Sequence, residues 1–139
     1  MAYATGLLAD PAATYRQIDV VGRTAIADGP ALVQLLYEEL VSALRSAAWA
    51  TEHGQLARKS ERVTRATAIL FALEAGLDFE NGGEMSITFA RLYAGARRQI
   101  VDGSLDQNPQ VFRDVATNIA DIAEAWETVR QMSKAKAGA

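Results

Sequence analysis

Four segments of the chain place apolar residues at alternating three- and four-residue steps, the pattern of amphipathic helices. The first predicted helix begins at Pro30, because proline suits the first helical turn, and ends in the TEHG segment 51–54. The second covers about 55–77, the third starts after Gly83 and ends within 102–109, and the fourth follows. The residues predicted to form the core are Leu32, Leu36, Leu40, Ala43 and Ala47; Val63, Ala66, Leu70, Leu73 and Leu77; Met85, Phe89, Leu92, Ala96 and Ile100; and Phe112, Val115, Ile119, Ile122, Trp126 and Val129.

The order of these segments predicts an all-α fold. No window of the sequence alternates with a period of two, as a half-buried strand would. Short connections favour antiparallel neighbours, so we expect an up-down four-helix bundle over residues 30–133. Residues 1–29 have weaker helical spacing and are predicted to be a leader segment or short helix that docks on the bundle. Residues 134–139 are predicted to be a disordered tail.

The segment LDFENGGE, residues 77–84, interrupts the helical pattern. Asn81, Gly82 and Gly83 adopt positive φ at low cost, which ends one helix and turns the chain. Glu84 then suits the positive end of the next helix. These residues lack the lysine and the Ser/Thr of a phosphate-binding loop, and no strand precedes them. The segment is therefore interpreted as a corner between antiparallel helices.

Composition and charge exclude several classes of function. A chain of 139 residues fits one domain, and its net charge of −3 argues against binding to a nucleic-acid backbone. No stretch approaches the ~20 apolar residues of a membrane span, so membrane insertion is not expected. The N-terminus lacks the pattern of a signal peptide, which leaves a cytoplasmic location as the expectation.

Catalysis, a cofactor and a metal centre are not expected either. The chain has no cysteine, and its one histidine, His53, lies in a predicted loop. A single histidine cannot supply a two- or three-imidazole zinc site or a di-iron site with two Glu-x-x-His motifs. Glu38 and Glu39 are adjacent and therefore point about 100° apart on a helix. We interpret the protein as a non-enzymatic binding protein.

Three of the predicted helices carry more apolar surface than a small bundle needs. A second set of apolar positions lies away from each core stripe, and exposed surface of this kind marks a partner site, a homodimer interface or tighter packing within the bundle. If the apolar residues of the leader cover one groove when no partner is bound, the leader is a displaceable lid. The candidate groove residues are Tyr37, Val41 and Leu44; Ala68, Ala72 and Phe79; and Ile87, Ala90, Ala94 and Val101.

Four sequence motifs resemble the FliS family of flagellar secretion chaperones. They are LVQLLYEEL at 32–40, GLDFENGGEM at 76–85, FARLYAGARRQI at 89–100 and AEAW at 123–126. The resemblance extends over about residues 13–130. The chain departs from the family pattern in TAIADGP, before the first helix, and in the pair Glu38-Glu39 after Leu36-Tyr37.

The resemblance implies a cytoplasmic helical bundle that binds the disordered C-terminal segment of flagellin. That segment would fold into helices in the apolar grooves. Its binding would prevent premature polymerisation of flagellin and keep flagellin competent for type III export. A component of the export gate would be a further partner. It also implies a leader that covers a groove, here with Tyr15, Ile18 and Val20. A monomer or weak homodimer is expected, and the alternative is a self-associating helical adaptor without a flagellin client.

Overall fold

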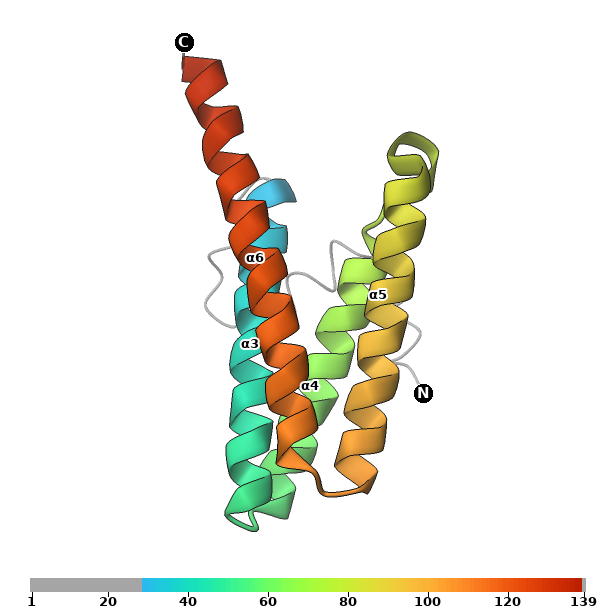
Figure 1. Ribbon diagram of the computed structural model, residues 1–139, viewed down its shortest axis with the longest axis vertical. Coiled ribbons are helices and arrows are strands. Elements are labelled where there is room, and N and C mark those ends of the chain that lie inside the picture. Colours follow the sequence, from blue (N-terminus) through green and yellow to red (C-terminus); the bar gives the residue numbers. More distant parts are fainter. Residues whose placement is uncertain (1–28, 139) are drawn as a thin grey trace.

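The computed structural model describes residues 29–138, and the side chains of residues 29–132. Four helices make up this part of the chain: α3 Gly29–Glu52, α4 Leu56–Ala75, α5 Phe79–Leu105 and α6 Pro109–Gly138 (Figure 1). Successive helices run antiparallel, which confirms the predicted all-α bundle. The proposed leader residues Tyr15, Ile18 and Val20 lie outside the described residues.

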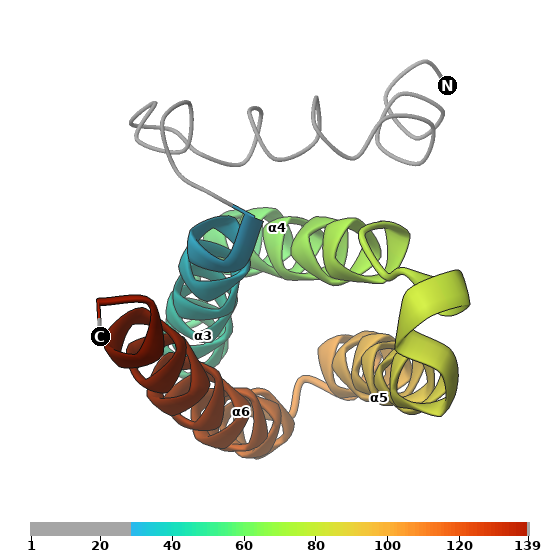
Figure 2. The same cartoon turned by 90° about the horizontal axis from the view of Figure 1, so that it is seen from above.

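The four helices form an incomplete bundle. α3 packs between α4 and α6, while α5 packs against α4 on one side and α6 on the other (Figure 2). At one end, the base, the α3–α4 and α5–α6 connections lie together. Towards the opposite end α4 and α5 diverge from α3 and α6, which gives the molecule the V shape of Figure 1. The sequence predicted a bundle but not this divergence.

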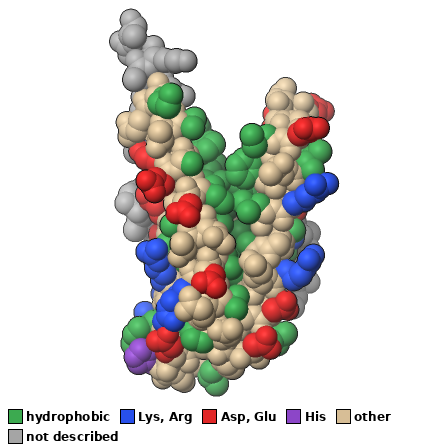
Figure 3. Space-filling model, in the orientation of Figure 1, with side chains coloured by type: hydrophobic (Ala, Val, Ile, Leu, Met, Phe, Trp, Pro, Cys, Tyr) green, Lys and Arg blue, Asp and Glu red, His purple; other side chains and the backbone are tan. Residues whose placement is uncertain are grey.

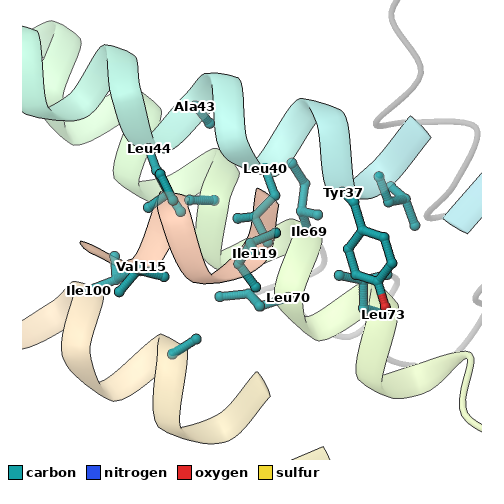
Figure 4. Packing of buried hydrophobic residues seen from close by; sticks show 14 of the residues in the cluster. Tyr37, Leu40, Ala43, Leu44, Ile69, Leu70, Leu73, Ile100, Val115 and Ile119 are labelled. Carbon is teal, nitrogen blue, oxygen red and sulfur yellow. The ribbon is translucent and has the colours of Figure 1, made fainter. Parts of the chain in front are cut away.

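The hydrophobic core occupies the region where all four helices are in contact (Figure 4). Burying one large apolar side chain in this core stabilises the fold by about 1.5–3 kcal/mol. These residues carry the three- and four-residue spacing found in the sequence, and most were predicted as core. The largest fully buried side chains are Tyr37, Leu40, Leu44, Ile69, Leu70, Ile100, Phe112 and Ile119.

Polar and close backbone contacts hold the base together. Lys59, only 6% exposed, donates through Nζ to the Ser104 carbonyl at 2.8 Å and to Gln107 Oε1 at 3.1 Å. The lysine thereby adds a charged donor to the Ser104 carbonyl in the last turn of α5. Gly103 lies against Val111 so closely that a Cβ would be 2.8 Å from Val111 Cγ1. These contacts fix α4, α5 and α6 relative to one another at the base.

The corner at residues 77–84 differs in detail from the prediction. Asp78 caps α5 by accepting hydrogen bonds from the N–H groups of Glu80 and Asn81, at 3.1 and 3.0 Å. The hydrogen bonds from Asn81, first from its backbone, hold the pKa of the Asp78 carboxyl below its usual range. The helix therefore begins at Phe79 rather than after Gly83, and it kinks at Gly83 with φ 52° and ψ −129°.

α5 ends at Leu105, within the segment 102–109 that was predicted to end it, and only residues 106–108 connect it to α6. Gln107 provides the reversal with a positive φ of 53°. α6 remains helical to Gly138, where the sequence predicted a disordered tail from residue 134.

Candidate binding surfaces

An open apolar cleft separates α5 from α6 at the end opposite the base. Gly103 on α5 and Val111 on α6 are in contact at the base. Met85 lies 18 residues before Gly103, and Val129 lies 18 residues after Val111. Because 18 residues make about five full helical turns, Met85 and Val129 lie on the same helix faces as Gly103 and Val111. Yet Met85 is 63% exposed and Val129 is 55% exposed. The faces that meet at the base therefore stand apart at the open end. Figure 3 shows apolar side chains gathered between the two arms of the V.

The cleft corrects part of the predicted core. Met85, Leu92 and Val129 have core spacing in the sequence, but Leu92 is also 38% exposed. Phe89 and Ile122 are half-buried against the core. The prediction that Met85, Leu92 and Val129 are core residues is wrong, because at this end α6 packs with α3 while α5 packs with α4. Helical spacing identifies the inward face but not the distance between two helices.

A pair of tyrosines connects α3 and α5 across the bundle. The hydroxyl groups of Tyr37 and Tyr93 are 2.7 Å apart and buried. Burial raises the pKa of the Tyr37 hydroxyl above its ordinary value of 10.0, and the hydrogen bond to Tyr93 partly opposes this. The ring of Phe89 stacks on that of Tyr93, with 5.9 Å between centroids. The pair fixes the separation of two helices that are not neighbours in the bundle.

A second surface, the outer groove, runs between α4 and α5 on the outside of the bundle. It has a volume of about 510 Å³. Ala94 and Val101, both predicted groove residues, line it together with Phe71, which the sequence analysis missed. Phe71 is 38% exposed and lies three residues after Ala68, so the same helical spacing could have identified it. The full lining is Thr67, Phe71, Ala94, Arg97, Arg98, Val101 and Asp102.

Arg97 organises the wall of the outer groove. Its guanidinium forms an ion pair with Glu74 on α4. The same guanidinium lies over the ring of Phe71, 4.2 Å from the centroid. A cation held over an aromatic face is attracted by the ring quadrupole, which favours one orientation of the ring. Arg97 therefore joins α4 to α5 and holds Phe71 in the groove.

The other predicted groove residues do not share one surface. Phe79 is 52% exposed and Ile87 is 45% exposed, while Val41, Ala68 and Ala90 are half-buried; none of these five lines the outer groove.

The prediction of surface positions is wrong for Tyr37, Leu44 and Ala72, which are at most 2% exposed and belong to the core. α3 lies between two helices, so a wide apolar arc is needed for packing on both sides.

Elsewhere in the described part of the chain, a smaller cavity of about 220 Å³ lies between α5 and α6 near the base and is lined in part by Gly103 and Val111. His53 is exposed, stacks on Trp49 and places Nδ1 2.8 Å from the Trp49 carbonyl oxygen, in agreement with a loop position. Among the described residues, no three His, Asp or Glu side chains are close enough to hold a metal ion. None of the described helices is long and apolar enough to cross a membrane.

Comparison with known proteins identifies the family. Residues 11–133 match the family model described as flagellar protein FliS. The chain belongs to the FliS family. The flagellar secretion chaperone FliS of Salmonella typhimurium is 31% identical over 116 residues, which cover 83% of this chain and 86% of the relative. The FliS of Vibrio cholerae is 27% identical over 115 residues, covering 83% and 85% of the two chains.

A third relative extends the same pattern. The flagellar secretion chaperone FliSB of Pseudomonas aeruginosa is 24% identical over 115 residues, covering 83% of this chain and 91% of the relative. The match to the FliS family therefore spans the bundle as a whole, including both the cleft and the outer groove. The resemblance found in the sequence motifs is confirmed.

Proposed function

We propose that this protein is a cytoplasmic flagellar secretion chaperone that binds the disordered C-terminal segment of flagellin. The observation that carries the proposal is the apolar surface left open in the cleft and the outer groove. Large exposed apolar areas on a single domain usually mark an interaction site. The FliS relatives are named as flagellar secretion chaperones, which supports a secreted flagellar protein as the client.

The two surfaces suit helices that form on binding. A groove between two helices accepts the apolar face of a third, with contacts at steps of three and four residues. Met85, Leu92 and Val129 in the cleft and Phe71 and Val101 in the outer groove are each 38–63% exposed. Covering one such side chain contributes about 1 kcal/mol, so the five contribute about 5 kcal/mol before the client's own apolar area is counted. This is enough to offset an ordering cost of about 2–5 kcal/mol for a disordered segment.

The proposal assigns two further roles. While the C-terminal segment of flagellin is held in the grooves it is unavailable for polymerisation, and the loaded complex is presented to a component of the export gate. The leader, with Tyr15, Ile18 and Val20, covers a groove until the client displaces it. A variant lacking residues 1–28 is expected to bind the client more tightly, because no leader has to be displaced.

Calorimetry tests the central claim. The full-length protein is titrated with the C-terminal segment of flagellin from the same organism at several temperatures. We expect one-to-one binding with a negative heat-capacity change, the mark of apolar burial. No binding heat at any temperature would refute the proposal. A dimer that persists at nanomolar dilution in sedimentation, without flagellin binding, would instead support the self-associating adaptor.

A charge placed in the outer groove tests where the client binds. Ala94→Asp puts a carboxylate into the apolar lining and is expected to weaken binding at least about tenfold, since an unpaired charge in a desolvated contact is costly. Val101→Asp, at a position 47% exposed, provides a second variant that perturbs folding less. Ser42→Asp adds the same charge on the exposed face of α3 and serves as the control. Equal loss of helicity and binding in both groove variants would place these residues in the core.

A further inference from the structure

Two arginines of α5, one in the lining of the outer groove and one two turns before it, form no ion pair with another described residue. Arg98 lines the groove, and Arg91 lies seven residues earlier on α5, so both side chains project from the same face of the helix. Both are exposed, and neither forms an ion pair with another described residue. Arg97 differs because Glu74 neutralises it. Figure 3 shows basic side chains standing out along α5.

The charges around the groove are arranged in an order. Arg91 and Arg98 are separated by about 10 Å along the helix, or two turns. Asp102 follows Arg98 by one turn and also lines the groove. This face of α5 therefore presents Arg91 beyond the groove, then Arg98 and Asp102 in its lining, which is two positive charges followed by one negative charge. A helix lying in the groove would meet these charges in the same order, at positions two turns and then one turn apart.

The floor of the groove selects a helix rather than an extended chain. Ala94 is small, so the backbone of a partner helix can approach α5 closely at this point. Phe71 and Val101 on either side provide apolar contacts for larger side chains. An amphipathic helix presents such an apolar strip with charged residues at its edges.

We propose that the outer groove recognises an amphipathic helix of the client that carries two carboxylates two turns apart, paired with Arg91 and Arg98. The inference rests on the proposed function in placing a client helix in this groove. Asp102 repels a carboxylate placed one turn further on, which restricts the register of the bound helix. The arginines thus set the specificity and alignment of the client, while the apolar floor provides most of the affinity.

Three model peptides test this chemistry without any flagellin sequence. Each is a helix-forming peptide of about 20 residues with the same Ala/Leu face and differs only at two edge positions seven residues apart, occupied by Glu, Gln or Lys. Affinity for the full-length protein is measured by fluorescence anisotropy at low and high salt. We expect the Glu peptide to bind about fivefold more tightly than the Gln peptide at low salt, and the Lys peptide to bind most weakly. High salt should remove most of the difference.

Paired variants locate the effect. Arg91→Gln with Arg98→Gln is expected to abolish the preference for the Glu peptide and leave the affinity for the Gln peptide unchanged. Arg45→Gln with Arg58→Gln removes the same two charges from α3 and from the start of α4, and should keep the preference. Equal affinities for all three peptides, no measurable binding of any of them, or an equal loss of preference in the control pair would overturn the proposal.

The outcome can be separated from that of the proposed function. If the flagellin segment binds but the model peptides show no charge preference in the groove, the charge recognition is wrong and the chaperone role stands. If the Glu peptide is preferred but the flagellin segment does not bind, the recognition stands and the client is another protein. A shift in sedimentation of Arg91→Gln with Arg98→Gln, without a change in peptide affinity, would assign the groove to a second copy of the chain and overturn the proposal.

Discussion

Replacing Leu92 by alanine tests whether the cleft between α5 and α6 is open in solution. Leucine and alanine differ by three carbon atoms, each worth about 0.8 kcal/mol when fully buried. Leu92 is 38% exposed, so the substitution should cost about 1.5 kcal/mol, and solvent rather than an empty cavity would replace the lost atoms. Ile100 lies eight residues later on α5 and is fully buried. Ile100→Ala should cost about 3–4 kcal/mol, because a cavity remains.

Urea unfolding followed by circular dichroism measures both changes. The two variants should have the same dependence of unfolding free energy on urea concentration as the parent protein, which shows that the unfolded states are comparable. The difference between the two costs is then about 2 kcal/mol. If Leu92→Ala destabilises the protein as much as Ile100→Ala, the cleft is closed in solution and the argument from its exposed apolar surface fails.

Two further predictions concern the backbone and pH. Gly83→Ala should destabilise the protein by about 1–3 kcal/mol in thermal unfolding, because φ is 52° at this position. Gly95→Ala has open space around its Cβ position and should stabilise α5 by up to about 1 kcal/mol. Equal effects of the two substitutions would contradict the kink at Gly83. Since the pKa of Tyr37 is raised in the folded state, the unfolded chain loses its proton first, and stability should fall as the pH rises above about 10. Tyr37→Phe should flatten that fall in urea titrations, and an unchanged slope would contradict it.

The helices and the centre of the core were predictable because local spacing determines them. Ile100, Phe112 and Ile119 lie on the inward faces that the three- and four-residue steps indicate, and all three are buried. In this region the four helices are close together, so that an inward-facing apolar residue is necessarily covered. The cap by Asp78 was missed because Asn81 and the glycines after it predict a break, whereas the carboxylate of Asp78 supports one more helical turn.

The cleft was not predictable, because spacing carries no information about the angle between helices. Met85 and Val129 have the same periodicity as buried residues and differ from them only in their height along the bundle. The distance between two helices at a given height depends on contacts between residues far apart in the sequence, such as Tyr37 with Tyr93 across the bundle. A single sequence does not reveal which residues form such pairs.

Only some of the predicted groove residues line the outer groove. Ala94 and Val101 lie in the outer groove because they occupy a face of α5 that only one neighbour borders. Leu44 occupies a similarly wide apolar arc on α3, but it belongs to the hydrophobic core and is fully buried. The width of an apolar arc indicates how much of a helix surface is apolar. It does not distinguish a surface covered by the protein's own helices from one left open.

The hydrogen bond from Trp126 Nε1 to the Pro30 carbonyl, 3.0 Å long, gives the molecule a built-in optical reporter. It places one of the two tryptophans beside the first turn of α3, at the open end, while Trp49 stands near the base. Emission from Trp126 in a Trp49→Phe background therefore reports on one end of the protein alone. Arrival of a ligand at this end can then be timed by stopped-flow mixing without attaching a dye.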